Sequence, residues 1–116
     1  MIDDDEAVCD SLRVLLDLAG LNVAAYGSAE DFLRDHPQQG SGRGCILLDI
    51  DLPGMSGLDL LRTLRRNGSR LPVVIITGRG APAVEQAEEA GALAVLEKPF
   101  LDGALMSCIE RALSVA

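Results

Sequence analysis

Apolar residues along the chain repeat with two alternating periodicities. Spacings of three and four residues predict helices over residues 6–19, 28–36, 58–66, 83–90 and 102–113. Short continuous apolar runs predict strands over residues 22–26, 45–48, 72–77 and 94–96. Strands that alternate with helices pack as a parallel sheet with helices on both faces. The pattern therefore predicts one α/β domain over residues 1–116, built on a doubly wound parallel sheet.

Turn and capping residues mark several of these boundaries. Gly20 is a C-cap candidate for the first helix, and Ser28 is an N-cap candidate with an acidic residue, Asp31, three positions later. The second helix is expected to stop at His36, because a proline follows it. The Asn67–Gly68 pair ends the third helix.

The strand expected ahead of the first helix is short. Only Met1 and Ile2 stand there, whereas a strand normally has about five residues. The sequence thus begins where a strand should be ending. Either the start has been lost or reassigned, or this strand is nearly absent, and the first strand is expected to be truncated or displaced.

Chemically active side chains follow the predicted strands, at the sheet edge where function gathers in open parallel sheets. They comprise an acidic cluster, a single carboxylate, a hydroxyl and an ammonium: Asp3–Asp5, Asp49, Thr77 and Lys98. Clustered carboxylates repel one another unless a cation neutralises them, and Mg²⁺ suits a site with one or two carboxylates and several waters. A carboxylate beside Mg²⁺ can attack phosphorus. Asp5 is interpreted as a helix cap or rim residue.

Composition narrows the class of protein. The 116 residues carry 10 Lys+Arg against 18 Asp+Glu, a net charge of −8, which argues against direct contact of this domain with nucleic acid. The sequence contains no apolar run of about 18 residues and no signal-peptide pattern, so we expect a cytoplasmic domain without a membrane span. Three widely spaced cysteines without a CxxC pair favour core packing over a disulfide or zinc framework.

Four motifs occur in order along nearly the whole chain: IDDDE, LLDIDLPGMSG, VVIITG and EKPF. Together they resemble the receiver domain of two-component response regulators, a CheY-like domain of flavodoxin-like topology, and FixJ/NarL-type transcriptional regulators are the most similar. The set is specific at these spacings, whereas one motif alone would be weak. The resemblance implies the strand order 2-1-3-4-5 and a switch controlled by phosphorylation.

The resemblance also implies a metal site around the phosphoacceptor. Asp49 resembles the phosphoacceptor, and Asp3 and Asp4 resemble the acidic pair, with Asp4 as the direct Mg²⁺ ligand and Asp3 acting through water. The backbone carbonyl of Asp51 resembles the third protein ligand of the metal.

Further positions match the part of the family pattern that contacts the phosphoryl group. Thr77 resembles the switch hydroxyl, and Lys98 resembles the ammonium that pairs with the phosphate. The Lys98–Pro99 peptide resembles the cis peptide of the family. Pro53 and Gly57 resemble the turn that shapes the loop beside the acceptor.

Three features depart from the family pattern. The first strand is missing most of its residues, so its two neighbours are left without a partner unless a segment is borrowed from another chain or the sheet is rearranged. Val95 stands at the position of the switch aromatic, and valine has no ring to swing between surface and interior. Asp51 adds a carboxylate beside the site, which either repels phosphodonor and hydrolytic water or points into solvent.

The leading functional hypothesis is a signalling switch that receives a phosphoryl group from a sensor histidine kinase with Mg²⁺, without turnover of an external substrate. Homodimerisation is expected through the face formed by Ala83–Ala116, and transcriptional output through a DNA-binding domain that is absent from these 116 residues. One alternative is a receiver-like interaction module that no longer signals. Another is a phosphatase of the haloacid dehalogenase type, suggested by the Asp49 and Asp51 pair, although its motif order differs.

Overall fold

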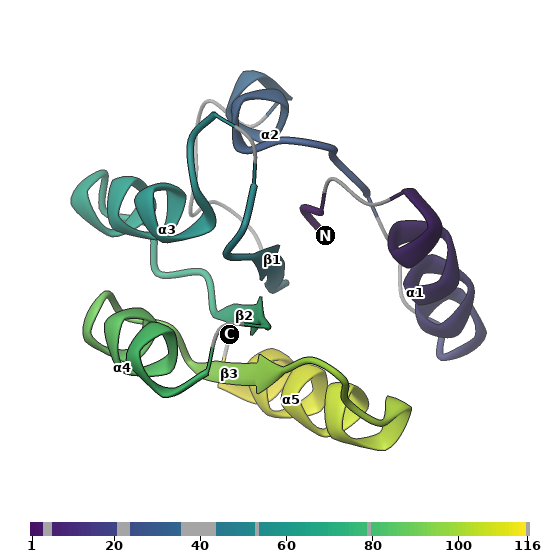
Figure 1. Cartoon of the computed structure of the whole chain (residues 1–116). Helices are drawn as coiled ribbons and strands as arrows, with labels where there is room; N and C mark the ends of the chain where they lie inside the picture. Colours follow the sequence, from purple (N-terminus) through teal and green to yellow (C-terminus); the bar gives the residue numbers. More distant parts are fainter. Residues whose placement is uncertain (4–5, 21–23, 36–43, 53, 79, 116) are drawn as a thin grey trace.

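From residue 29 onward helices and strands alternate along the chain, as the sequence predicts (Figure 1). The first two helices follow one another with no strand element among the residues described between them. The structure, a computed structural model, describes residues 1–3, 6–20, 24–35, 44–52, 54–78 and 80–115. Its elements are α1 (Glu6–Leu18), α2 (Ala29–Asp35), β1 (Ile46–Asp49), α3 (Gly57–Arg66), β2 (Val73–Thr77), α4 (Ala81–Glu89), β3 (Ala94–Glu97) and α5 (Asp102–Val115). The predicted α/β class is confirmed. The predictions for Asp4, Asp5, His36 and Pro53 fall on residues outside the described ranges.

The three strands form one parallel sheet in the order β1-β2-β3. Isolated parallel bridges join Ile2 to Tyr26 on one side and to Leu48 of β1 on the other. If the bridged segments at Ile2 and Tyr26 are counted as the first and second strands of the chain, β1, β2 and β3 are the third, fourth and fifth. Across the sheet the order is then 2-1-3-4-5. The first strand is therefore truncated but keeps its central position.

The predicted strand over residues 22–26 is not formed among the residues that the structure describes there. Tyr26 makes a single bridge, supported by a hydrogen bond from its N–H to the Met1 carbonyl (2.9 Å) and one from the Asp3 N–H to its own carbonyl (3.1 Å). Among the described residues, the pairing of this segment is limited to contacts with Met1–Asp3.

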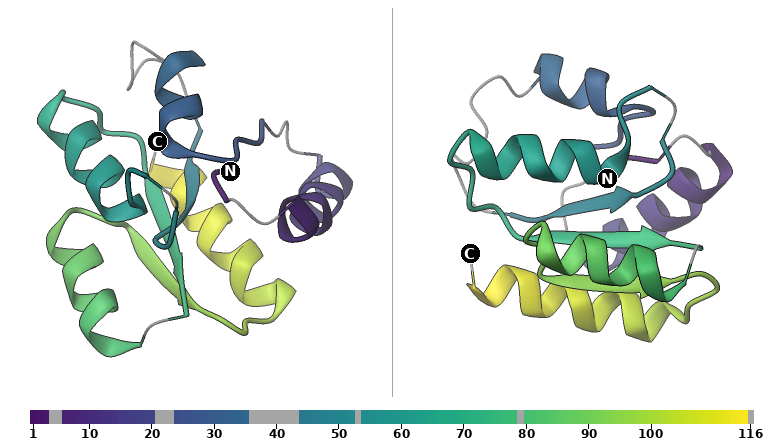
Figure 2. Two further views of the ribbon diagram at one scale, coloured as in Figure 1. Left: turned by 45° about the horizontal axis from the view of Figure 1, so that its top comes forward. Right: turned by 60° about the vertical axis from the view of Figure 1, so that its left-hand side comes forward.

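Alternate residues of the apolar strands supply two cores, one on each face of the sheet. One core contains Ile46 and Leu48 together with side chains of α2, α3 and α4. The other contains Leu47 together with side chains of α1 and α5. Figure 2 shows the same division, with α2, α3 and α4 on one side of the sheet and α1 and α5 on the other. The continuous apolar runs in the sequence are thus explained by burial on both faces.

The predicted helix boundaries are close to the observed ones. The Ser28 hydroxyl oxygen accepts a hydrogen bond from the Asp31 N–H (3.1 Å), so the predicted N-cap of α2 is formed. Gly68 follows α3 with a φ of +86°, as a glycine after a helix often does. The start of α4 differs, because the helix begins at Ala81, two residues before the predicted position, with Pro82 in its first turn. Proline is accepted there because that turn needs no N–H donor.

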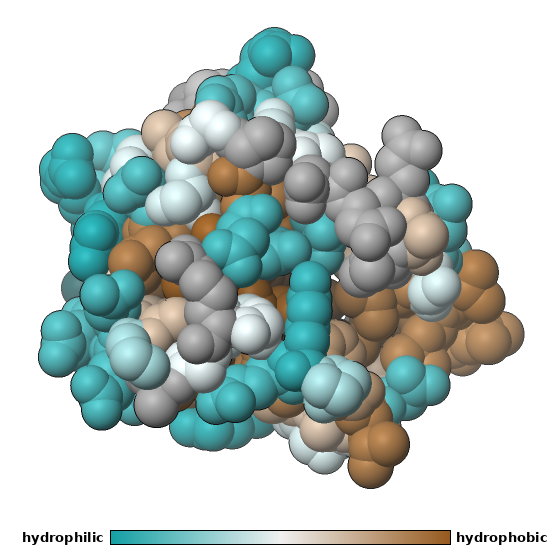
Figure 3. All heavy atoms as spheres, in the orientation of Figure 1, coloured by the Kyte–Doolittle hydropathy of each residue, from teal (hydrophilic) through white to brown (hydrophobic). Residues whose placement is uncertain are grey.

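Two large apolar side chains of α1 are exposed at the surface. Val14 is 61% exposed and Leu18 is 83% exposed. Figure 3 shows apolar atoms gathered on the right of the molecule, where α1 lies. Within the part of the chain that the structure describes, no helix is long and apolar enough to cross a membrane.

Candidate functional site at the carboxyl edge of the sheet

The ends of neighbouring strands bring the predicted polar side chains to one edge of the sheet. Asp49 is the last residue of β1, and its N–H donates to the Ile2 carbonyl (2.9 Å), so Asp3 lies next to it on the adjoining segment. Thr77 is the last residue of β2, and its carbonyl accepts from the Lys98 N–H (2.8 Å). Residues from four places in the sequence therefore meet at this edge.

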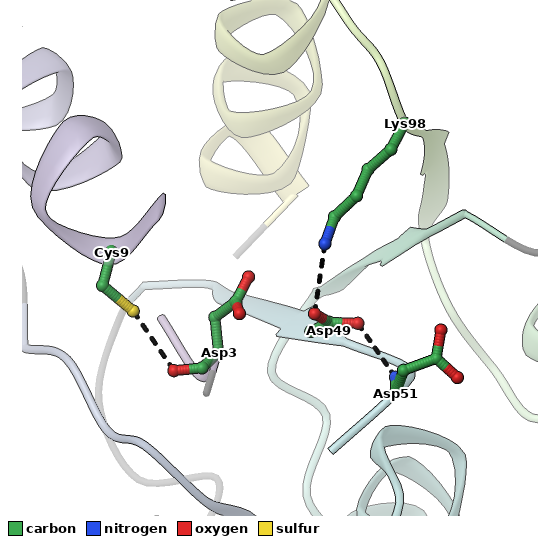
Figure 4. A network of polar contacts seen from close by, with 5 residues as sticks. All are labelled: Asp3, Cys9, Asp49, Asp51 and Lys98. Atoms are coloured by element: carbon green, nitrogen blue, oxygen red, sulfur yellow. Dashed lines mark hydrogen bonds and ion pairs between the residues drawn. The ribbon is translucent and has the colours of Figure 1, made fainter. Parts of the chain in front are cut away.

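Both oxygens of the Asp49 carboxylate have a hydrogen-bonding partner (Figure 4). The Lys98 ammonium lies 3.2 Å from Oδ2, and the Asp51 backbone N–H donates to Oδ1 (2.9 Å). The Asp49 side chain is only 6% exposed, whereas that of Lys98 is 38% exposed. The lysine thus extends from the solvent toward a buried carboxylate.

Asp3 adds a second buried carboxylate to the same edge. It is 3% exposed, and its backbone carbonyl accepts a hydrogen bond from the Cys9 thiol (3.3 Å) on α1. In Figure 4 its carboxylate lies on the side of Asp49 away from Asp51. Two buried carboxylates beside the single ammonium of Lys98 leave an excess of negative charge, which a bound cation would relieve.

The donor atoms at this edge fit Mg²⁺ in their chemistry. Asp3 and Asp49 supply carboxylate oxygens, and the backbone carbonyl of Asp51 is a third oxygen close by in sequence. Within the described ranges, no group of three or more histidine, cysteine or acidic side chains is close enough to hold a metal ion. Mg²⁺ nevertheless needs only one or two protein carboxylates, because waters complete its octahedron.

The other predicted site residues lie at or near this edge with different exposure. Thr77 is completely buried. The Asp51 side chain is exposed, and in Figure 4 its carboxylate points away from that of Asp49. This arrangement agrees with the solvent-facing alternative for Asp51. The Lys98–Pro99 peptide bond is cis.

Val95 lies on β3, away from the carboxyl edge, and is partly buried against the core shared by α2, α3 and α4. It borders a surface hollow of about 570 Å³ that is also lined by residues of α4 and α5, among them Glu88, Cys108 and Arg111. This hollow lies on the face formed by α4, β3 and α5.

The loop after Asp49 is fixed by close backbone contacts. The Gly57 N–H donates to the Ile50 carbonyl (3.1 Å), and a Cβ at position 57 would overlap the carbonyl oxygen of Asp49. Only glycine allows this approach of α3 to the acceptor strand. The Ser56 hydroxyl oxygen caps α3 by accepting from the Asp59 N–H (3.1 Å).

Sequence reasoning missed one residue that contacts this loop. Glu30, in the first turn of α2, accepts a hydrogen bond from the Met55 N–H to its Oε2 (3.2 Å). The two residues are 25 positions apart, so no local pattern indicates the contact. The glycine at position 54 is a partial signal in the sequence, because glycine is the residue that tight turns with positive φ favour. In the structure its φ is +71°.

Fold and site together define a doubly wound α/β domain that presents a carboxylate–ammonium pair at the carboxyl edge of its sheet. The profile of the response regulator receiver domain matches residues 1–110. The chain belongs to this family.

Several full-length response regulators contain a similar domain. The transcriptional regulatory protein FixJ of Bradyrhizobium diazoefficiens is 41% identical over 117 residues, which cover 100% of this chain and 56% of FixJ. The response regulator protein TodT of Pseudomonas putida is 39% identical over 117 residues, covering 100% of this chain and 51% of TodT. The chain therefore spans about half the length of these relatives.

Solved structures agree with the sequence comparison. The crystal structure of FixJ-N matches with a TM-score of 0.88 and 38% identity, and covers 99% of this chain and 91% of that one. The response regulator StyR matches with a TM-score of 0.89 and 38% identity over 98% of this chain and 57% of that one. The predicted CheY-like fold is confirmed.

Family membership confirms the leading hypothesis at the level of the domain. The chain is a receiver domain of two-component response regulators, a signalling switch rather than a metabolic enzyme. Response regulators are phosphorylated by sensor histidine kinases, and their receiver domains generally bind Mg²⁺.

Proposed function

We propose that Asp49 of this receiver accepts a phosphoryl group from a histidine of a sensor kinase. The observation that carries the proposal is the Asp49 carboxylate itself, which is buried and held on both oxygens, by Lys98 at 3.2 Å and by the Asp51 N–H at 2.9 Å. A carboxylate fixed in this way keeps one orientation at the sheet edge, so a lone pair of one of its oxygens can be aligned for in-line attack on phosphorus.

The transfer exchanges one bond to phosphorus for another. An oxygen of the Asp49 carboxylate forms a bond to phosphorus as the phosphorus–nitrogen bond of the phosphohistidine breaks. The imidazole leaves with the electron pair of that bond and takes up a proton. Water later hydrolyses the acyl phosphate to the Asp49 carboxylate and inorganic phosphate, which resets the switch.

The acidic residues at the edge would hold the metal. In the proposal, Asp4, Asp49 and the backbone carbonyl of Asp51 bind Mg²⁺ directly, Asp3 acts through a water, and further waters complete the coordination. These residues would hold the metal where its charge would offset that of the carboxylates and of the phosphoryl oxygens. Asp3 supports this assignment because it lies beside Asp49 and is almost fully buried.

Lys98 and Thr77 would bind the phosphoryl group once it is on Asp49. Lys98 reaches the carboxylate from the solvent side, so its ammonium can move to a phosphoryl oxygen without leaving the edge. Thr77 is completely buried before phosphorylation, so its hydroxyl would reach the phosphoryl group only when the end of β2 shifts. That shift would transmit the signal, in place of the aromatic rotation that Val95 cannot perform.

We also propose that the whole protein regulates transcription, since FixJ is a transcriptional regulatory protein and shares this domain. In this proposal the domain lies in the cytoplasm, and phosphorylation favours a homodimer through the face of α4, β3 and α5, within residues 83–116. The DNA-binding domain would lie outside the 116 residues, and the acidic receiver would not touch DNA itself.

One experiment tests phosphorylation of Asp49 directly. The chain is incubated with acetyl phosphate, with and without Mg²⁺, and weighed by intact mass spectrometry. We expect an adduct of one phosphoryl group that requires Mg²⁺ and is lost in Asp49→Ala. Asp59→Ala, an exposed aspartate in the first turn of α3, is the matched control and should keep the adduct. Absence of an adduct in folded wild-type protein would favour the alternative, an interaction module that no longer signals.

A further inference from the structure

The middle of the loop after Asp49 is held by a side chain from another element. The Met55 N–H donates to Oε2 of Glu30 on α2 (3.2 Å). Gly54 lies against the same carboxylate, because a Cβ built at position 54 would be 2.5 Å from Glu30 Oε2. With its φ of +71°, Gly54 turns the backbone so that the following N–H points at the carboxylate.

The contact comes from a helix that is already fixed in the core. Ala29 is completely buried and Phe32 is 7% exposed. The Phe32 ring packs edge-on against Tyr26, with ring centroids 5.6 Å apart. Glu30 itself is exposed, so its carboxylate contributes little to the burial that anchors α2. Its interaction with the loop is therefore separable from the packing of the helix.

The loop held by Glu30 is the one that positions Asp49. Asp51, at the start of this loop, donates its N–H to Asp49 Oδ1 (2.9 Å). Gly57, at its end, donates to the Ile50 carbonyl (3.1 Å). One end of the loop is thus tied to Asp49 and the other to Ile50, the residue after it, and the Glu30 carboxylate holds residues 54 and 55 between them.

We propose that Glu30 is a positioning residue for the phosphoryl transfer, and that it acts by holding residues 54 and 55 so that the Asp51 N–H stays on the Asp49 carboxylate. A hydrogen bond to a charged acceptor is stronger than one between neutral groups, which suits this role in an exposed loop. The proposal rests on phosphorylation of Asp49 as its functional consequence. No contact between Glu30 and the phosphoryl group is involved.

The test compares two variants of Glu30 with a control on the same turn. Glu30→Ala removes the acceptor, whereas Glu30→Gln keeps an oxygen that can accept the Met55 N–H. Asp31→Ala is the matched control, because it also removes one acidic side chain from the first turn of α2, and that half-exposed side chain pairs with Arg34 (3.1 Å). The Ser28 cap uses the backbone N–H of Asp31 and is retained.

The first readout is amide hydrogen exchange, which requires no phosphorylation. In Glu30→Ala, exchange at both Met55 and Asp51 should become about tenfold faster, because the loop opens more often. Exchange in Glu30→Gln and Asp31→Ala should stay close to wild type. Unchanged exchange at Asp51 in Glu30→Ala would overturn the proposal, since the loop would then hold Asp49 without the help of Glu30.

The second readout is the rate of Mg²⁺-dependent phosphorylation by acetyl phosphate, measured well below the melting temperature of every variant. Glu30→Ala should be slowed by about tenfold, with near wild-type rates in Glu30→Gln and Asp31→Ala. A wild-type rate in Glu30→Ala would overturn the functional part of the proposal. If wild-type protein itself is not phosphorylated, the proposed function fails, and exchange at Asp51 alone decides whether Glu30 positions the loop.

Discussion

Gly57 is the residue at which α3 begins directly against the acceptor strand. A Cβ at this position would overlap the Asp49 carbonyl oxygen and lie 2.8 Å from the Ile50 Cα. Both are backbone atoms, so no side chain can rotate to make room. We expect Gly57→Ala to lower the free energy of unfolding by about 1–3 kcal/mol and to slow phosphorylation of Asp49, because the acceptor strand must shift. Urea unfolding and the acetyl phosphate assay measure the two effects.

Gly103 on α5 provides the matched control for this substitution. Beyond its own stretch of helix, a Cβ at position 103 would meet no heavy atom within 4 Å. Gly103→Ala should leave phosphorylation unchanged and raise the free energy of unfolding by up to about 1 kcal/mol, because alanine is the better helix former. Equal stability of Gly57→Ala and wild type would show that the strand end is more adaptable than its contacts indicate.

Two titrating groups near the start of the sheet predict a pH dependence of stability. Burial lowers the pKa of the Met1 amino group below its ordinary value of 8.0, and it raises the pKa of the Cys45 thiol above 9.0. Just below pH 8 the amino group is therefore more fully protonated in the unfolded chain than in the folded one. The free energy of unfolding contributed by this group rises as the pH approaches 8. The folded chain keeps the Cys45 proton longer, so stability falls as the pH rises above 9.

Urea unfolding between pH 6 and 10 measures this dependence. The free energy of unfolding should fall above pH 9 in wild type and fall less steeply in Cys45→Ala. Cys108→Ala, which replaces another half-buried thiol, is the control for loss of the side chain alone. An unchanged alkaline slope in Cys45→Ala would assign the effect to other groups.

At the scale of single residues, the strand-end rule accounts for most of the site. It places Asp3, Asp49, Thr77 and Lys98 at one edge, because parallel strands share that edge. It does not show that Thr77 is buried, since that depends on how the neighbouring elements pack. Glu30 could not be predicted either, because its contact depends on where α2 comes to lie against a loop 25 residues away.

At the scale of elements, the truncated first strand leaves backbone groups available beside it. The Leu47 carbonyl accepts from the Ile2 N–H (2.8 Å). Backbone groups of one residue point to the same neighbour in a parallel pair, so the Leu47 N–H faces the place ahead of Met1. Ile2 contributes to the core of α2, α3 and α4, whereas Met1 packs against the core of α1 and α5. Residues added ahead of Met1 would continue this alternation.

This geometry predicts that a short apolar extension stabilises the domain. Addition of Val-Ile-Val ahead of Met1 should raise the free energy of unfolding by about 1–3 kcal/mol, through added strand pairing and burial on both faces. Addition of Gly-Ser-Gly, of the same length, should have no stabilising effect. Melting temperatures of the three proteins measure the difference. Equal melting temperatures for the two extensions would show that the space beside Leu47 cannot accept a strand.

The elements differ in how well the sequence predicts them. Local patterns predict α3 and β2 closely, because the amphipathic spacing of α3 and the β-branched run of β2 are strong signals. The strand predicted over residues 22–26 has suitable composition, yet its formation depends on a partner strand of sufficient length. Pairing is a non-local property, so composition alone could not show that, of the residues described in this segment, Tyr26 alone would bridge.

At the scale of the whole molecule, the proposed dimer face and the exposed apolar residues of α1 belong to different elements. The hollow on the face of α4, β3 and α5 carries both signs of charge, with Glu88 and Arg111 among its lining residues. A twofold dimer can pair Glu88 of one copy with Arg111 of the other, because an isologous interface is self-complementary. The exposed Val14 and Leu18 belong to α1, which is not one of the three elements that form this face.

This arrangement predicts which charge reversal prevents dimerisation. With beryllium fluoride and Mg²⁺ as the phosphoryl mimic, light scattering should show a dimer of wild type. Arg111→Glu should weaken dimerisation by about tenfold or more, because like charges would then meet. Arg66→Glu, an equally exposed reversal on α3, should dimerise as wild type does. A dimer unaffected by Arg111→Glu would place the interface on another face.

The pairing of Lys98 with Asp49 has a practical consequence, because Lys98 is the only lysine in the chain. Protein grown with nitrogen-15 lysine would carry one isotopic reporter, whose side-chain ammonium lies 3.2 Å from the Asp49 carboxylate. A single resonance could then report metal binding, phosphoryl capture and reset in real time, without assignment of a crowded spectrum.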